Sequence, residues 1–166
     1  MPIDPDKLLA LAIPEIRQSY GWRDTVLYAL GVGVGQDPVD ERQLAFVDET
    51  RLQALPTMAS ILAHPGFWIR ELETGIDWRR VVHAEQSLRV HRPIPAQATV
   101  RAVTRVLEVV DKGAGKGALV RYGREILDAG TDTPIATAEQ VSICRGAGGF
   151  GGSHVNSSLS RVCTTS

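Results

Sequence analysis

The stretch VVHAEQSLRVHRPIP, residues 81–95, decides the fold of this chain. Apolar and polar side chains alternate along it, and this period of two is typical of a strand with one buried face. The apolar positions are Val82, Ala84, Leu88 and Val90, and only Gln86 interrupts them. Pro93 and Pro95 close the stretch, as prolines do at the end of a strand. We predict a long central strand.

Three similar segments follow, each rich in Val, Ile and Thr and bounded by turn residues. The four predicted antiparallel strands are residues 81–92, 98–110, 118–127 and 135–145. The connectors DKGAGKG and DAGTDTP have the composition of hairpin loops. Strands of about a dozen residues, against a usual five or six, predict a strongly curved sheet that wraps around something.

Two helical segments precede this sheet and are the natural filling for it. In residues 24–34, Asp24 is a candidate N-cap and apolar residues recur at helical spacing. Residues 57–64 place Met58, Ile61 and Leu62 on one face of a short helix that stops at Pro65. Residues 44–47 are a short strand candidate between the two. We expect one domain over residues 20–152, with a lead-in at 1–19 and a flexible polar tail at 153–166.

Composition excludes several classes of function. Lys and Arg total 18 and Asp and Glu total 19, so the net charge of -1 gives no field to attract nucleic acid or an anionic membrane. No apolar run approaches the roughly 20 residues of a membrane-spanning helix. The first residues carry acids where a secretory signal carries bases, which predicts a cytoplasmic or organellar location. Two cysteines, Cys144 and Cys163, are too few for a disulfide framework or a zinc site, and we expect Cys144 to be buried.

Two glycine-rich motifs suggest phosphate binding and fail the test. GAGKG at 113–117 lacks the Ser or Thr and the helix that follow the lysine of a phosphate-binding loop. Gly31, Gly33 and Gly35 follow a helix rather than a strand, which reverses the dinucleotide-binding order. A flexible hairpin and a helix ending are the simpler interpretations, and we expect no cofactor.

Two groups of residues are candidates for a site. His83 and Glu85 lie two apart on one strand, so their side chains are expected on the same face, where they could act as base and orienting acid. Alternatively, both face solvent or a subunit interface. An acyl tunnel could be lined by Met58, Ile61, Leu62, Phe67 and Trp68, or these residues could simply be core. No Ser–His–Asp set and no metal-ligand cluster is recognisable by pattern.

Several motifs together resemble the N-terminal half of the type 2, or (R)-specific, 2-enoyl-CoA hydratases of the MaoC-like dehydratase group. In order, they are YALGVG at 28–33, FV at 46–47, LPT at 55–57, VHAEQ at 82–86, RPIP at 92–95, DKG at 111–113 and GGFGG at 148–152. The resemblance implies an α+β hot-dog fold, in which a long curved antiparallel sheet wraps a helix. It also implies an acyl-CoA thioester as substrate or ligand, and two hot-dogs in each active unit. The substrate-binding candidates are then His83, Glu85, Gln86, Met58, Ile61, Phe67 and Trp68.

One departure from the family decides the expected mechanism. The complete enzymes add water to a trans-2-enoyl-CoA through an Asp and a His in the motif Gly-Asp-x-Asn-Pro-x-His, which lies on the C-terminal hot-dog. This chain has no such motif, and its nearest approach, GQDP at 35–38, lacks both Asn and His. We therefore assign no catalytic residue and expect the chain to supply scaffold and acyl site. It would end where the second hot-dog is expected to begin.

Two other functions stay open. One is a self-paired hot-dog thioesterase with Glu85 or another carboxylate as its base, and the other is a non-catalytic module that binds acyl-CoA or a protein partner. An unpaired hot-dog would leave a long sheet edge exposed, so we predict a dimer, either of two copies or with a catalytic MaoC-like partner. The predicted location is cytoplasmic, or peroxisomal in a eukaryote.

Overall fold

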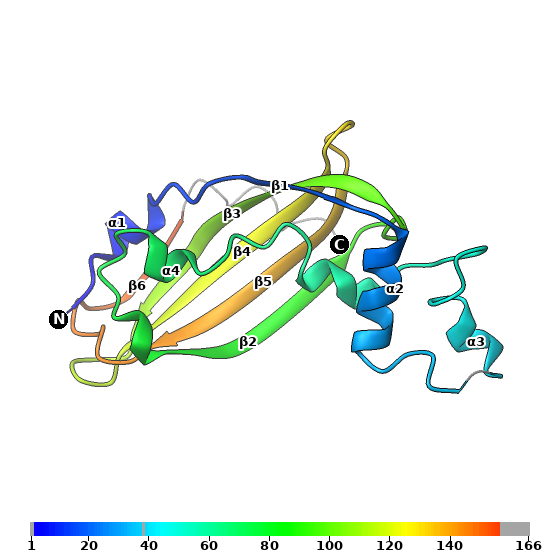
Figure 1. Cartoon of the computed structure of the whole chain (residues 1–166). Helices are drawn as coiled ribbons and strands as arrows, with labels where there is room; N and C mark the ends of the chain where they lie inside the picture. Colours follow the sequence, from blue (N-terminus) through cyan, green and yellow to red (C-terminus); the bar gives the residue numbers. More distant parts are fainter. Residues whose placement is uncertain (1, 38, 157–166) are drawn as a thin grey trace.

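A curved antiparallel sheet dominates the computed structural model, which describes residues 2–37 and 39–156 (Figure 1). Five strands lie in the order β1-β3-β4-β5-β2, and β6 pairs with β3 beside β1. Their bounds are β1 Ile16–Tyr20, β2 Val81–Val90, β3 Ala98–Asp111, β4 Ala118–Asp128, β5 Pro134–Cys144 and β6 Ser153–Val155. The four predicted strands are confirmed, each to within two residues at either end.

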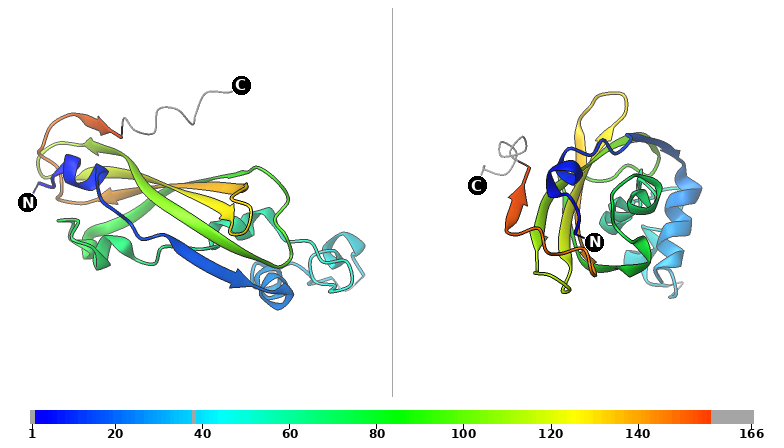
Figure 2. Two further views of the ribbon diagram at one scale, coloured as in Figure 1. Left: turned by 90° about the horizontal axis from the view of Figure 1, so that it is seen from above. Right: turned by 90° about the vertical axis from the view of Figure 1, so that its left-hand side faces the viewer.

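Short helices cover one face and the two ends of this sheet. They are α1 Pro5–Leu9, α2 Trp22–Gly31, α3 Glu41–Leu44, the 3-10 helix η1 Pro56–Ser60, α4 Trp68–Glu71 and the 3-10 helix η2 Trp78–Arg80. Figure 2, right, looks from the α1 end and shows the strands curving partway around the green segment that carries η1 and α4. We call the sheet face that packs against this segment the concave face. This is the α+β hot-dog arrangement.

The filling differs from the predicted helix over 57–64. Only Pro56–Ser60 is helical, as a 3-10 turn, and the chain then reverses at Ala63, whose φ of 46° is left-handed. The second predicted filling, α2, begins three residues earlier than expected, because its N-cap is Gly21 and not Asp24. Asp24 is instead the third helical residue, and its carboxylate accepts a hydrogen bond from the Gly21 backbone N–H at 2.8 Å.

Three further expectations need correction. Residues 44–47 form no strand, because Asp40 caps the short helix α3 through the backbone N–H of Arg42, and a turn follows it. The lead-in contains α1 and β1, and its side chains Ile3, Leu8 and Ile13 belong to the core. The expected polar tail begins with a paired strand, β6, while residues 157–166, including Cys163, lie outside the described part of the chain.

The concave face carries two separate apolar clusters. The first joins α1 and α4 to one end of the strands, with Leu8, Trp68 and Val120 among its members. The second packs η1 against the other end, with Met58 and Leu62 at its centre. Cys144 is fully buried in the first cluster, as predicted, and burial raises the pKa of its thiol to about 12.

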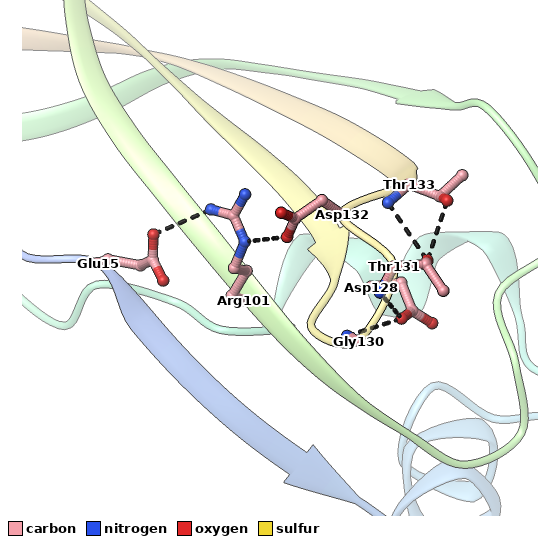
Figure 3. A network of polar contacts seen from close by, with 7 residues as sticks. All are labelled: Glu15, Arg101, Asp128, Gly130, Thr131, Asp132 and Thr133. Atoms are coloured by element: carbon pink, nitrogen blue, oxygen red, sulfur yellow. Dashed lines mark hydrogen bonds and ion pairs between the residues drawn. The ribbon is translucent and has the colours of Figure 1, made fainter.

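A polar network fixes the β4–β5 hairpin (Figure 3). Arg101 on β3 donates to Glu15 at 2.9 Å and to Asp132 at 2.8 Å, so it ties the start of β1 to the hairpin loop. Within the loop, Asp128 accepts hydrogen bonds from two backbone N–H groups, which holds the turn closed. The Asp, Gly and Thr residues of this loop therefore form the tight hairpin turn that the sequence predicts.

At the opposite end of the sheet from the β4–β5 hairpin, the Asp111 carboxylate binds two glycine-rich loops together, an arrangement that we call the glycine clasp. Asp111 accepts hydrogen bonds from the backbone N–H groups of Gly113, Gly149 and Gly151. These bonds hold the pKa of Asp111 below its usual value of 3.8, because they favour the charged form. The motif at 113–117 thus packs against the loop at 146–152.

We expect Asp111→Asn to lower the free energy of unfolding at neutral pH, because an amide presents an N–H group where an acceptor is needed. The folded-state pKa is lowered, so the stabilisation is present above pH 3.8 and disappears as the pH falls through the folded value. Urea unfolding at pH 7 and near pH 3 measures the difference between the two proteins. Glu49→Gln is the control, and an equal difference at both pH values would contradict the clasp.

Candidate functional site

A polar band separates the two apolar clusters on the concave face. Strand register aligns its members across four strands, since Thr104 lies opposite Arg124, Tyr122 opposite Gln140, and Ser142 opposite His83. Gln86 also lies opposite Gln140. Buried apolar residues flank this band at both ends. Thr104, Arg124 and Ser142 are buried, whereas His83 and Gln86 on the edge strand β2 are exposed.

Two adjacent cavities lie over this band. The larger, of about 180 Å³, is lined by His64, Gly66, Phe67, Trp68, Ile69, Val81, His83, Tyr122, Gln140 and Ser142. The smaller, of about 10 Å³, is lined by His64, Pro65, Gln86, Thr104, Tyr122, Arg124, Ala138 and Gln140. The two share three residues, so they are neighbouring parts of one site.

His64 covers both cavities from the loop after η1. The left-handed turn at Ala63, whose N–H donates to the Gln18 side chain on β1, brings the chain back toward the sheet. Incomplete hydration and the positive charge of Arg124 lower the pKa of His64, so its ring is neutral at pH 7. Because the Gly66 N–H donates to Nδ1 at 3.2 Å, the ring proton is on Nε2.

His83 is held by an amide on the neighbouring strand. Its Nδ1 lies 2.6 Å from Nε2 of Gln140, a hydrogen bond between β2 and β5. Tyr122 lies between this pair and the wall formed by Trp68, with the two rings edge to face at 5.2 Å. Burial raises the pKa of Tyr122, so it is a neutral hydroxyl at pH 7.

The prediction that His83 and Glu85 share a face is wrong. Ala84 is a β-bulge without a partner in the register, so His83 lies opposite Ser142 while Glu85 lies opposite Val141. Alternate residues of β5 face opposite sides of the sheet, which places Glu85 on the convex side. The bulge instead brings Gln86 to the same face as His83.

Arg124 is the charged member of the polar band. Only 5% of its surface is exposed, and burial lowers its pKa. Its Nη2 donates to the carbonyl oxygen of Ala59 at 3.2 Å and to that of Ser60, so it holds the last turn of η1 against the sheet.

The structure brings four of the seven predicted binding residues together. Phe67, Trp68 and His83 line the larger cavity, and Gln86 lines the smaller one. Met58 is 2% exposed within the second apolar cluster, and Ile61 is 51% exposed. Neither lines a cavity, nor does Glu85.

Sequence analysis missed most of the polar band. The missed residues are His64, Thr104, Tyr122, Arg124, Gln140 and Ser142. A signal existed, since Thr104, Arg124, Gln140 and Ser142 occupy positions of the predicted strands that the alternating pattern assigns to the buried face. A polar side chain at a position expected to be buried is unusual, and it therefore marks a candidate binding residue.

The side chains that line the cavities can bind and orient a ligand. The described lining has no carboxylate that could act with a histidine as an acid–base pair. Neither cavity contains Asp or Glu among its described lining residues, and the two histidines belong to different elements. In residues 2–37 and 39–156, no group of three His, Cys, Asp or Glu side chains could hold a metal ion. The same residues contain no helix long and apolar enough to cross a membrane.

Comparison with known families gives this geometry its context. A family model described as the MFE-2 hydratase 2 N-terminal domain matches residues 18–146, which include the whole polar band. The chain belongs to this family. As a hydratase 2 N-terminal domain, it has both cavities within the matched segment. Of the three glycines bonded to Asp111, Gly113 lies within the match, and Gly149 and Gly151 lie after it.

Individual proteins that resemble this hydratase 2 N-terminal domain are named enoyl-CoA hydratases. It is 35% identical over 159 residues to enoyl-CoA hydratase ChsH3 of Mycobacterium tuberculosis, covering 92% of this chain and 54% of the relative. It is 32% identical over 160 residues to the peroxisomal enoyl-CoA hydratase 2 of Arabidopsis thaliana, covering 89% and 50%. The chain thus spans about half the length of these curated relatives.

A solved structure supports the fold. The MaoC-like dehydratase from Phytophthora capsici superposes with a TM-score of 0.70 at 23% identity, covering 90% of this chain and 51% of that one. At this level of identity the match establishes the hot-dog fold.

Proposed function

We propose that this chain is the acyl-binding hot-dog half of an (R)-specific 2-enoyl-CoA hydratase whose catalytic Asp and His lie on a second hot-dog. The observation that carries the proposal is the pair of concave-face cavities, whose described lining has aromatic and polar side chains and the cation Arg124 but no carboxylate. Such a site suits binding, whereas hydration needs a base for water and an acid for the alpha carbon.

The family supports the reaction class. Curated relatives are named enoyl-CoA hydratases and a 3-hydroxyacyl-thioester dehydratase, and these names describe the forward and reverse directions of one reaction. Water would add across the double bond of a trans-2-enoyl thioester to give the (R)-3-hydroxyacyl thioester. In this division of labour, the chain binds the acyl group and leaves the proton transfers to its partner, and the chemistry needs no cofactor.

The free edge of β2 supports a second hot-dog. Among the described strands, β2 is the last in the sheet and pairs only with β5, so one side of a ten-residue strand carries unpaired backbone groups. Pairing of two such edges would continue the sheet from one hot-dog into the next. Solved hot-dog structures similar to this chain include two complexes from Mycobacterium tuberculosis, HadBC and ChsH1-ChsH2.

Reconstitution tests the proposal. The chain alone should hydrate crotonyl-CoA at the background rate, because it lacks the acid and base. Mixing it with a MaoC-like hot-dog that carries Gly-Asp-x-Asn-Pro-x-His should raise the rate about 100-fold or more, since each positioned acid or base contributes at least that much. Loss of the enoyl-thioester absorbance measures the rate.

A partner whose motif His is replaced by Ala is the control, and it should form the complex without activity. Full hydratase activity of the chain by itself would overturn the proposal. The thioesterase alternative gains no support, because Glu85 lies across the sheet from both cavities and no other carboxylate is among their described lining residues. A cytoplasmic location, or a peroxisomal one in a eukaryote, belongs to the same proposal, and the peroxisomal relatives favour the latter for eukaryotic members.

A further inference from the structure

Arg124 is a buried cation without an anionic partner in the described chain. It is 5% exposed, it takes part in no ion pair within residues 2–37 and 39–156, and its Nε atom has no hydrogen-bond acceptor there. Buried charged groups in proteins are normally paired, because an unpaired one costs several kcal/mol. The bonds from Nη2 to Ala59 and Ser60 explain how Arg124 supports η1, but they leave Nε unexplained.

The smaller cavity lies against this arginine and is rich in donors. Its lining includes the amides of Gln86 and Gln140, the hydroxyl of Tyr122 and the ring of His64, whose proton is on Nε2. The lining contains no carboxylate among the described residues. A volume of about 10 Å³ accommodates one water-sized atom, such as a single oxygen.

The two adjacent cavities together offer room for a short chain that ends in an oxygen atom. The larger, at about 180 Å³, is close to the volume of roughly 150 Å³ that holds a benzene molecule, and so fits a chain of about six carbons. His64, Tyr122 and Gln140 line both cavities, so a group that fills the larger one ends beside the smaller. A purely hydrocarbon end would leave the buried Nε of Arg124 without an acceptor.

We infer that this site selects acyl groups that carry an oxygen acceptor, most strongly a carboxylate, at the far end of a short chain, with Arg124 as the specificity-determining residue. This inference rests on the proposed acyl-CoA function and names its substrate class. The carboxylate oxygen occupies the smaller cavity, accepts from Nε of Arg124 and neutralises the buried charge.

Calorimetry of the full chain with three acyl-CoA ligands of equal length tests the inference. Adipoyl-CoA should bind about tenfold more tightly than hexanoyl-CoA, because a hydrogen bond to a charged group is gained. 6-Hydroxyhexanoyl-CoA should lie between them. If the hydroxy ligand binds as tightly as adipoyl-CoA, the preference for a carboxylate is overturned and only the preference for an oxygen acceptor stands.

Equal or tighter binding of hexanoyl-CoA would overturn the inference and leave the proposed acyl-CoA function standing. Binding of none of the three ligands would overturn both. The two failures are therefore distinguishable in one experiment.

Two variants test whether the preference for adipoyl-CoA arises in the smaller cavity. Arg124→Met should abolish the preference, so that adipoyl-CoA binds no more tightly than hexanoyl-CoA. Because this variant also loses the bonds to η1, Ala138→Val provides a second approach. Ala138 lines only the smaller cavity, so a larger side chain fills it while Arg124 keeps its bonds.

Arg121→Met is the matched control, since Arg121 lies on the same strand and pairs with Glu108 and Glu139 on the convex face. Circular dichroism checks that each variant is folded. Retention of the full adipoyl preference by both Arg124→Met and Ala138→Val would overturn the assignment to this cavity.

Discussion

Replacing Gly148 with alanine should destabilise the fold by about 3 kcal/mol or more, because a new side chain has no room there. A Cβ atom at this position would lie 2.6 Å from the carbonyl oxygen of Gly113 and closer still to that of Gly117. Both are backbone atoms, so the two glycine-rich loops must separate to admit the methyl group. Separation also weakens the bonds from Asp111 to the same loop.

Urea unfolding followed by tryptophan fluorescence measures this loss. Gly31→Ala is the control, since a Cβ atom added at Gly31 would meet no other side chain or loop within 4 Å, and alanine favours the end of helix α2. The control should unfold at the same or a slightly higher urea concentration. An unchanged midpoint for Gly148→Ala would mean that the loops are not held together in solution.

The strands were predictable because their signals are local. Alternation along residues 81–90, together with Asp, Gly and Pro in the connectors, is enough to place each strand. The glycine-rich motif at 113–117 is visible in the sequence. Its structural role is not, because that role depends on a second loop at 146–152 that is distant in the sequence. Only the fold brings Asp111 to Gly149.

The site was less predictable because its geometry depends on long-range pairing. Period-two reasoning placed Glu85 beside His83, and the bulge at Ala84 reversed that assignment. Strand β1 was missed because its five residues alternate weakly and gain their place from pairing with β3. Arg124 was not singled out, although its strand position faces the concave side.

The central filling is the second place where a small change should have a large effect. Leu62→Ala should lower the free energy of unfolding by about 2–5 kcal/mol, since Leu62 is 1% exposed and packs in the second apolar cluster. A hot-dog with a long central helix could share this loss among many side chains. Here the helical part is five residues long, so Leu62 and Met58 carry much of the contact with the sheet.

Ile61→Ala is the matched control because it removes a side chain of equal size from the adjacent position, where 51% is exposed. Its unfolding free energy should change by about 0.5 kcal/mol or less. The loop that carries His64 follows directly, so Leu62→Ala should also weaken acyl-CoA binding, while Ile61→Ala should not, as Ile61 lines neither cavity. Equal losses of stability in both variants would contradict the placement of Leu62 in the core and of Ile61 at the surface.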